Sequence, residues 1–291
     1  MIQPKSKLEL KRLIEEEIEK KGSTVNLNHI DVSQITDMSH LFYKSIFNGD
    51  ILEWDVSNVK DMSWMFAYSK FDGKNTDLSE WDVSNVEDMS FMFGFTHFNG
   101  DISKWNVSNV KNMGYMFFHS EFNNDISKWD VSKVENMKNM FFMSKFNRNI
   151  SDWNTSNVKN MFAMFMQTIF NQDISNWDVS SVENMSHMFY RSNFNKDLNE
   201  WNVSNVKDMS WMFAFSEFDG NISDWDVSNV EDVSHMFHYS KFNGNLSKWN
   251  LKKINKKEKI KWMFRKTYII PKDILNWKWQ LPKDIDINDL F

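Results

Sequence analysis

Hydrophobic and polar positions along this chain follow a pattern that repeats every 24 residues. Tryptophan marks the period most clearly, and Trp54 precedes the first of the evenly spaced tryptophans by 27 residues. The three additional residues lie around Gly73, Lys74 and Asn75. A fixed period of about 20–50 residues is the signature of a repeat architecture, in which similar units stack on one another. The evenly spaced tryptophans are Trp81, Trp105, Trp129, Trp153, Trp177, Trp201, Trp225 and Trp249.

Two kinds of apolar spacing occur inside each unit. With the tryptophan as position 0, the unit reads W-[DN]-V-S-N-V-[KE]-[DN]-M-S-x-M-F-x-x-S-x-F-N-x-D-I-S-x. Positions −3, 0 and +2, as in Ile102, Trp105 and Val107, have the LxxLxL spacing of the strands in leucine-rich repeats. Positions +5, +8, +11 and +12, from Val110 to Phe117, have a helical spacing. The sequence therefore predicts an α/β solenoid, a leucine-rich-repeat-like array of about ten strand–helix repeats with terminal caps.

Stacking is required for burial, because a single unit of this size cannot cover its own apolar face. Tryptophan, valine, methionine and phenylalanine would then recur at the same depth in each unit and form ladders. The 20 methionines and the 14 tryptophans are thus expected to form a structural core, and no cofactor is needed to explain them.

The repeated motif FNxDISxWDVSNVxDMSxMF resembles the BspA-type leucine-rich repeat proteins of bacterial surfaces. Typical units of that family are one residue longer and often carry a small residue or cysteine before the phenylalanine turn, whereas this chain has no cysteine. The resemblance implies a leucine-rich-repeat-like solenoid and, for many members, adhesion to proteins or to other cells. It implies no catalytic residue.

The two ends of the chain read as caps, which cover the core of the terminal units. Residues 4–21 predict an amphipathic helix with Ser6 and Glu9 in capping-box spacing and Gly22 just beyond its end. Its buried side would consist of Leu10, Leu13, Ile14 and Ile18. We expect residues 1–24 to form an N-terminal capping helix, 25–250 the repeats, and 251–291 a degenerate last repeat and C-terminal cap. The residues expected to close the last unit are Trp277, Trp279, Leu281 and Ile285.

Composition and the N-terminal sequence bear on localisation. The net charge of −6 favours solubility and does not indicate a nucleic-acid partner. The first residues contain no apolar stretch of a secretory signal, and no segment has the length of a membrane span. Read literally, the protein is cytoplasmic; if the sequence is a trimmed segment, a cell-surface or secreted protein is the alternative.

Charges alternate strictly at position +6. Opposite charges of neighbouring units would lie side by side, and a slip of one repeat would bring like charges together. We expect these residues to fix the register of the array, with a banded surface for a charged partner as the alternative. They are Lys60, Glu87, Lys111, Glu135, Lys159, Glu183, Lys207 and Glu231.

Position +10 carries the candidate binding residues. On an ideal helical wheel it points away from the apolar positions, and exposed aromatic residues are typical of interfaces. The candidates are Trp64, Phe91, Tyr115, His187, Trp211 and His235, in a row that also contains His40, Asn139 and Ala163. If the short helix were partly a 3₁₀ helix, the row would instead turn toward a neighbouring unit. A competing surface is the strand-side row, which consists of Glu53, Asp55, Glu80, Asp82, Lys104, Asn106, Lys128, Asp130, Asp152, Asn154, Asp178, Asp224 and Asp226.

Enzymatic and metal-binding chemistry finds little support. Only His235 and His238 are close in sequence among the seven histidines, and no third ligand is placed near them. No GxSxG, HExxH or phosphate-binding glycine loop occurs. Asp and Asn at +1, +7, +18 and +20 would suit calcium, but hydrogen bonds in turns explain them more simply. We therefore expect no enzyme, no metal and no cofactor.

The expected function is a non-enzymatic protein-interaction scaffold, monomeric or weakly oligomeric, with no small-molecule substrate. One alternative is an adhesin displayed on the cell exterior. Another is binding to nucleic acid or an anionic surface through a basic C-terminal cluster, which salt would weaken steeply. That cluster consists of Lys252, Lys253, Lys256, Lys257, Lys259, Lys261, Arg265 and Lys266.

Overall fold

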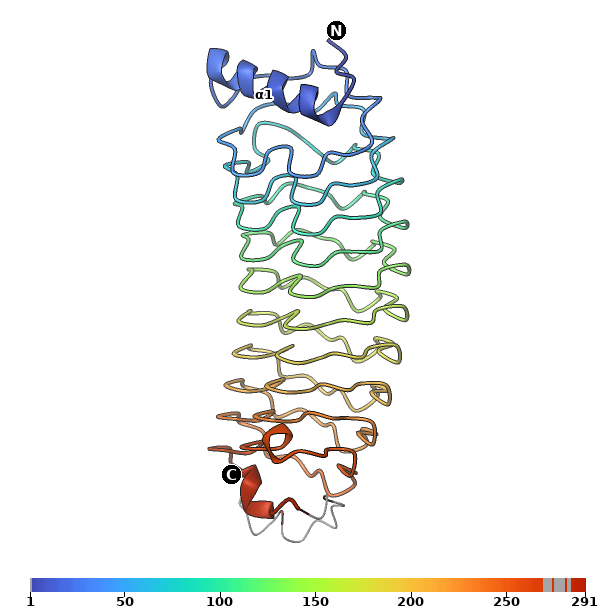
Figure 1. The fold of residues 1–291 in the computed structure, drawn as a ribbon, viewed down its shortest axis with the longest axis vertical. Helices are drawn as coiled ribbons and strands as arrows, with labels where there is room; N and C mark the ends of the chain where they lie inside the picture. The colour runs from blue at the N-terminus through green and yellow to red at the C-terminus, as the bar shows by residue number, and fades with distance from the viewer. Residues whose placement is uncertain (1, 269–273, 275–280, 282–283) are drawn as a thin grey trace.

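The chain winds into coils that stack along the long axis of the molecule, one coil for each repeat (Figure 1). This architecture was obtained as a computed structural model, which describes residues 2–268, 274, 281 and 284–291. The N-terminus lies at one end of the stack and the C-terminus at the other.

Helix α1, Lys7–Lys21, lies across the N-terminal end of the stack (Figure 1). It begins at Ser6, whose hydroxyl accepts a hydrogen bond from the Glu9 N–H, and it ends at Gly22 with φ of 89°. The Glu9 carboxylate accepts from the Lys5 N–H at 2.8 Å. The Ser6 half of the expected capping box therefore forms, whereas the Glu9 carboxylate binds the N–H of the residue before Ser6. Leu10 and Ile14 are fully buried, and Leu13 and Ile18 pack partly buried against the core. The predicted helix and its buried side are thus confirmed, although the helix begins at Lys7 and not at residue 4.

The strand and the helix expected within each repeat do not form. Within residues 2–268 and 284–291, the helices besides α1 are two short 3₁₀ helices, η1 at Lys257–Lys259 and η2 at Ile287–Leu290. Neighbouring coils are joined by single parallel bridges at position +7, such as Asp88 with Asn112. Each coil is instead a series of turns, and the prediction of strand–helix units was wrong.

Turns with hydrogen bonds between residues three apart replace the predicted elements. Trp105 N–H donates to Ile102 O at 3.2 Å, and Met116 N–H donates to Met113 O at 3.2 Å. Tyr115 and His119, at +10 and +14, have positive φ, so the chain leaves the right-handed conformation that a continuous helix requires. Apolar residues at +5, +8 and +11 consequently have helix-like spacing although no helix is present.

Backbone N–H and C=O groups of neighbouring coils are paired by hydrogen bonds. At every second position from +8 to +14, the N–H group of one coil donates to a carbonyl group of the next coil. Position +8 donates to the +7 carbonyl of the next coil, as Met113 N–H does to Asn136 O at 3.0 Å. Positions +10, +12 and +14 continue the pattern, as when Tyr115 N–H donates to Lys138 O at 2.8 Å. Because buried backbone groups must be paired, this ladder allows an interior without regular strands.

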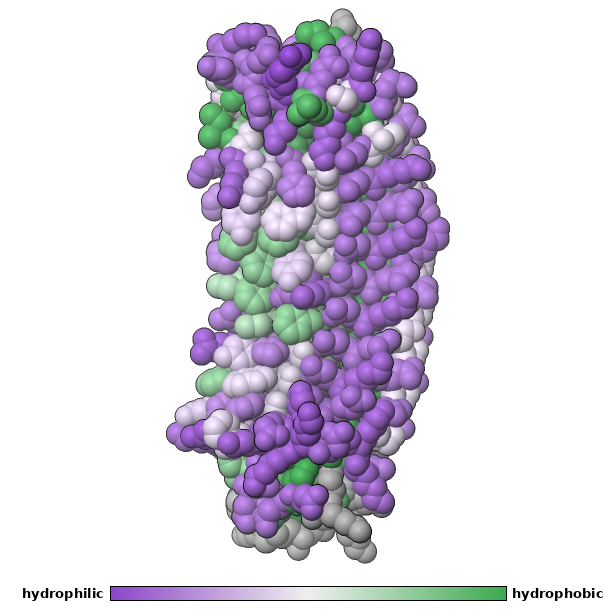
Figure 2. Space-filling view, in the orientation of Figure 1, coloured by the Kyte–Doolittle hydropathy of each residue, from purple (hydrophilic) through white to green (hydrophobic). Residues whose placement is uncertain are grey.

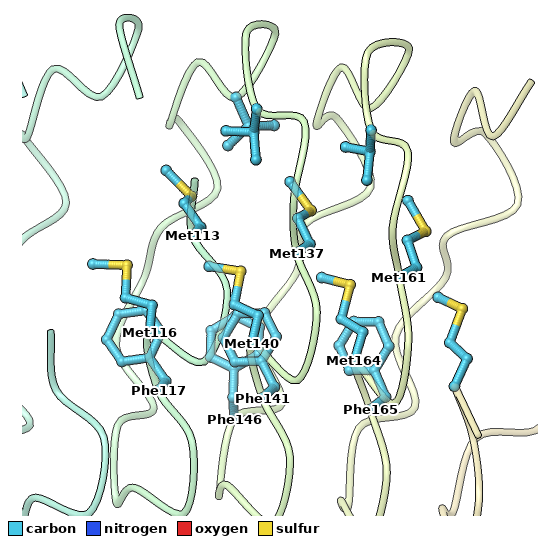
Figure 3. Packing of buried hydrophobic residues seen from close by; sticks show 14 of the residues in the cluster. Met113, Met116, Phe117, Met137, Met140, Phe141, Phe146, Met161, Met164 and Phe165 are labelled. Carbon is cyan, nitrogen blue, oxygen red and sulfur yellow. The ribbon is translucent and has the colours of Figure 1, made fainter. Parts of the chain in front are cut away.

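Ladders of identical side chains fill the interior, as expected. Methionines at +8 and +11 and phenylalanines at +12 lie in parallel rows from coil to coil (Figure 3). The rings of Phe117 and Phe141, for example, are 5.8 Å apart and nearly parallel. Each repeat tryptophan except Trp81 donates its Nε1–H to the −3 carbonyl of the preceding coil at 2.7–3.2 Å. The tryptophan and methionine stripes are therefore structural.

Aspartate and asparagine side chains close the corners of each coil. At +1, Asn106 Oδ1 accepts from the N–H two residues later at 3.2 Å, and Asn112 at +7 does the same at 3.1 Å. Asp101, at +20 of the preceding unit, accepts from the Ser103 N–H at 2.9 Å. At +18, Asn123 N–H donates to Asn99 Oδ1 in the preceding coil at 2.8 Å. These side chains accept hydrogen bonds from backbone N–H groups at the turns, in agreement with the interpretation of the sequence.

The charge alternation at +6 also appears as predicted. The ammonium groups of Lys111, Lys159 and Lys207 each lie 2.6–2.7 Å from the glutamate of the preceding coil. Lys111 thereby lowers the pKa of Glu87. Ion pairs at +6 thus join every second pair of neighbouring coils, at exposed positions.

At the C-terminal end, the last residues continue the ladder. Trp262 N–H donates to Asp289 O at 2.9 Å and Phe264 N–H to Leu290 O at 2.7 Å. Leu290 in η2 is fully buried. Leu281 and Ile285 pack partly buried against the core as expected, whereas Trp277 and Trp279 lie outside the described residues.

Candidate interaction face

Large side chains at +10, +13 and +14 come together along one side of the stack. Residues at +10 and +14 have φ between 51° and 61° in every coil. Ring contacts join the three rows, for example Tyr43 at +13 with Tyr68 at +14 of the next coil, 5.9 Å apart. We call positions +9, +10, +13 and +14 of all coils the aromatic face; it is the candidate site that the fold builds.

The predicted +10 residues line this face, but they do not point freely into solvent. Trp64, Tyr115, His187, Trp211 and His235 are half-buried. Phe91 is only 7 % exposed, because its ring covers Gly94, where a Cβ atom would lie 2.4 Å from the ring. Elsewhere in the row, His40 is exposed, and Asn139 and Ala163 are buried. The helical-wheel expectation was therefore wrong: the left-handed backbone turns +10 toward neighbouring coils.

Rings at +10 stack along the axis in two runs. Trp64 has His40 at 5.5 Å on one face and Phe91 at 3.8 Å on the other, with interplanar angles of 5° and 1°. Trp211 lies in the same way between His187 at 6.0 Å and His235 at 4.0 Å. Because neighbouring rings cover both faces of each tryptophan, their edges are left to meet a ligand. Edges carry the positive end of the ring quadrupole.

Positions +13 and +14 were missed by the sequence analysis, although they hold the most exposed large side chains of the face. Tyr68, Met143 and Tyr239, all at +14, are 41–44 % exposed. The sequence did indicate these residues, because aromatic side chains recur at +14. A helical wheel, however, did not single out +14 as an exposed position. In Figure 2 a band of weakly polar and apolar residues runs along the stack beside strongly hydrophilic surface.

The aromatic face is cationic although the chain is acidic. No aspartate or glutamate occurs at +9, +10, +13 or +14 of any coil from His40 to Lys266. Several cations lie over rings: Lys138 is 5.6 Å from Tyr115, and Arg191 is 5.1 Å from Phe215. Such contacts stabilise a cation at the surface by about 0.5–1 kcal/mol. The Lys and Arg residues at these positions are Lys44, Lys138, Arg191, Lys261, Arg265 and Lys266.

A groove crosses the N-terminal half of the face. Its volume is about 610 Å³, and one side is formed by Trp64, Phe91 and Tyr115. Phe118 and Gly114 also line the groove. The groove is large enough for side chains of a bound segment.

The competing strand-side row is polar, and many of its oxygens already have partners. Asp55 and Asp82 each accept from the backbone N–H two residues later at 3.0 Å. Hydrogen bonds from Ser84 lower the pKa of Asp82. Lys104 pairs with Glu80 at 2.5 Å. A partner would have to displace these interactions, so this row is the weaker candidate.

The basic C-terminal cluster is partly neutralised within the fold. Lys257 pairs with Asp289 at 2.6 Å and Lys259 with Asp232 at 2.5 Å. Lys253 lies 3.4 Å from Glu231. Lys261 and Arg265 instead lie over the Trp262 ring, at 4.2 and 4.6 Å, and so belong to the aromatic face.

The histidine pair at the C-terminal end is packed among rings. The rings of His235 and His238 are 5.3 Å apart and nearly perpendicular. Burial, followed by the charges of His235 and Arg265, lowers the pKa of His238 to about 4. In the part of the chain that the structure describes, no group of three or more His, Cys, Asp or Glu residues could hold a metal ion.

Comparisons with known proteins identify a family but no activity. A family model described as "Mycoplasma protein of unknown function, DUF285" matches residues 10–121, 118–216 and 191–291. No curated protein and no solved structure gave a significant match. None of the helices in the described residues combines the length and the apolar character needed to cross a bilayer. The chain consists of tandem repeats of this bacterial type, and it belongs to the DUF285 family of Mycoplasma proteins of unknown function.

Proposed function

We propose that this protein is a non-enzymatic solenoid scaffold that binds a protein partner through its aromatic face. The likeness of its motif to BspA-type repeats supports an interaction role. The same face would serve a cytoplasmic scaffold or an adhesin on the cell exterior.

The observation that carries this proposal is the presence of large rings at left-handed positions. A residue other than glycine costs about 1–3 kcal/mol in such a conformation. Stability of the turn alone would favour glycine or asparagine at +10 and +14. Yet +10 carries asparagine only at Asn139, and neither position carries glycine. Stacking of rings offsets part of the cost, by about 0.5–1.5 kcal/mol for each pair, and binding to a partner accounts for the exposed ring edges.

Nucleic acid is a poorer fit to the same geometry. Binding to single strands relies on bases that stack on exposed faces of aromatic rings. Here the faces of Trp64 and Trp211 are occupied by neighbouring rings. An edge-lined surface suits aliphatic and aromatic side chains of a protein instead.

A capture experiment with a variant patterned on this chain's own sixth coil tests the proposal. That coil carries Ala163 at +10 and Gln167 at +14, so both residues are compatible with the backbone. The face variant is Trp64→Ala/Tyr68→Gln/Trp211→Ala/Phe215→Gln, checked by circular dichroism. A control with equal numbers of changes on the strand side, each at position −1 directly before a repeat tryptophan, is Glu53→Ala/Asp152→Ala/Glu200→Ala/Asp224→Ala.

We expect a protein from nuclease-treated host lysate, identified by cross-linking and mass spectrometry, to bind the wild type and the control but not the face variant. Cross-links from the partner should map to the aromatic face. Retention by the face variant together with loss in the strand-side control would overturn the proposal. So would a partner that disappears after nuclease treatment.

A further inference from the structure

Two patches of the aromatic face, six coils apart, share His, Tyr and Trp at their first three positions and carry an aromatic or imidazole ring at the other two. Patch A consists of His40, Tyr43, Trp64, Tyr68 and Phe91, and patch B consists of His187, Tyr190, Trp211, Phe215 and His235. The correspondence extends to a cation at +14 of the first coil, which is Lys44 in patch A and Arg191 in patch B.

The ring geometry of the two patches is also similar. The tryptophan stacks on the preceding histidine at 5.5 Å in patch A and 6.0 Å in patch B, and on the following ring at 3.8 and 4.0 Å. The tyrosine at +13 approaches the tryptophan at a steep angle, 76° and 60°. The cation lies over this tyrosine at 5.1 Å in patch A and 5.4 Å in patch B.

The face between the patches differs from both. Asn139 is 4 % exposed and Ala163 is fully buried, so the row of +10 rings is interrupted. Lys138 fills the interruption, with its ammonium 5.6 Å from the Tyr115 ring and 5.2 Å from the Phe162 ring. The row of +10 rings is therefore divided into two runs, one in each patch. Six coils at about 4.8 Å place them roughly 29 Å apart.

We infer that the protein is bivalent: patches A and B are two copies of one site, each for an acidic polypeptide segment that carries an apolar side chain. This inference rests on the proposed function and specifies its partner. The acidic character follows from the cation in each patch and from the lack of carboxylates at all four positions of the face. The aspartates near the patch histidines, Asp61 and Asp208 at +7, accept hydrogen bonds from the backbone N–H groups of Ser63 and Ser210. The apolar side chain follows from the outward ring edges.

A second copy of this chain is a poor occupant of the same patches. An antiparallel pair of aromatic faces would bring Lys44 of one copy toward Arg265 and Lys266 of the other, and like charges oppose each other across an interface. The fitting partner is one that repeats its acidic segment, either along one chain or in two subunits.

Bivalency has a geometric consequence that can be measured. An extended chain spans about 3.3 Å for each residue, so about nine residues are needed to bridge roughly 29 Å. Two linked segments should bind together only when the linker exceeds this length. The gain in affinity for such linked binding is about 10²–10⁴-fold.

The test uses peptides selected on the wild-type protein from a displayed library of random sequences of about twelve residues. We expect the selected peptides to be rich in Asp and Glu and to carry Leu, Ile or Phe. Calorimetric titration should give two bound peptides for the wild type and one for Trp64→Ala/Tyr68→Gln or for Trp211→Ala/Phe215→Gln. The matched control Asn139→Ala should keep two, and the variant with all four changes should bind none.

A tandem peptide completes the test. With a linker of about fifteen residues it should bind the wild type at least about 100-fold more tightly than the single peptide, whereas each single-patch variant should show no gain. With a linker of about four residues the gain should be absent. A single bound peptide on the wild type, or loss of all binding when only one patch is changed, overturns bivalency but leaves the face as a binding surface. Selected peptides that are not acidic, or that bind the four-change variant unchanged, overturn the assignment of the partner. If in addition the protein partner is retained by the face variant, the proposed function fails as well.

Discussion

Trp81 is the one repeat tryptophan whose buried Nε1–H has no acceptor among the described residues. Trp177 is typical of the other repeat tryptophans, because its Nε1–H donates to Ile150 O at 2.9 Å. The three-residue insertion around Lys74 directly precedes the coil of Trp81, so its register relative to the preceding carbonyl differs. We predict that Trp177→Phe destabilises the protein more than Trp81→Phe does, although both changes remove the same atoms.

The size of the difference follows from hydrogen bonding. Both indoles are nearly fully buried, 4 % exposed at Trp81 and 2 % at Trp177, and each stacks on one neighbouring tryptophan. The cavity cost is therefore similar and cancels in the comparison. Trp177→Phe loses a bond of about 0.5–1.5 kcal/mol, whereas Trp81→Phe removes an unpaired buried donor that costs about 1–3 kcal/mol. The two free energies of unfolding should thus differ by about 1.5–4.5 kcal/mol.

Denaturation in urea, followed by circular dichroism, measures this difference. Circular dichroism is preferred because both changes alter tryptophan fluorescence directly. Comparison of midpoints requires that the slope with denaturant stays the same, because a change in slope indicates a change in the unfolding reaction. Equal or greater destabilisation by Trp81→Phe at unchanged slope would refute the reasoning.

Three further outcomes are expected. The pKa of His238 is lowered by burial to about 4 from 6.5, so the unfolded state binds the proton first. Wild-type stability should therefore fall between pH 6.5 and about 4 relative to His238→Ala, and parallel urea midpoints would contradict this. Gly220→Ala would place a Cβ atom 2.4 Å from Lys196 O, so we expect a loss of about 1–3 kcal/mol in thermal or urea unfolding, against little change for the control Lys196→Ala. Deletion of one coil, residues 105–128, brings two glutamates together at +6, whereas deletion of two, residues 105–152, restores an opposite pair. Added salt should thus stabilise only the shorter deletion relative to wild type, and an equal response of both to salt would contradict the role of the alternation.

The period and the ladders of the core could be predicted from the sequence, because each depends only on which residues recur. The 24-residue step of the tryptophans specifies the stacking, and identical residues at +8, +11 and +12 specify the ladders. The +6 ion pairs could be predicted in the same way, because charges that alternate strictly from one unit to the next bring opposite charges together when the units stack. The N-terminal helix was predictable because Ser6 and Gly22 mark its ends locally.

The conformation within the unit could not be predicted, because helices and successive three-residue turns share their apolar spacing. Met113 and Met116 are three apart in either case. What distinguishes them is the left-handed backbone at positions such as Tyr115, and a tyrosine gives no sequence signal of a positive φ. The hydrogen bonds that hold this backbone come from the next coil, as in Tyr115 N–H to Lys138 O. Tertiary contacts override the local preference there.

The sequence analysis predicted one row of the candidate face but not its other rows, because it assumed a helix where the chain has left-handed turns. A helical wheel selects +10 alone, whereas two left-handed residues four apart bring +13 and +14 to the same side. Tyr68 and Tyr239 therefore escaped notice although they are among the most exposed rings. The predicted competitor, the strand-side row, is occupied by its own turn hydrogen bonds.

Within one coil, different positions hold the fold together and form the candidate binding face, which explains how such a face can be specific for a partner. Position +12 is phenylalanine in every coil from Phe42 to Phe264, because its ring must fit a ladder of identical rings. Position +10 lies two residues away and varies among His, Trp, Phe, Tyr, Asn and Ala. Its backbone is held by hydrogen bonds to the next coil, as Tyr115 N–H shows, and these do not depend on the side chain. The fold therefore constrains the conformation at +10 without specifying the residue, so the order of residues along +10, +13 and +14 can encode which partner binds while the core stays the same.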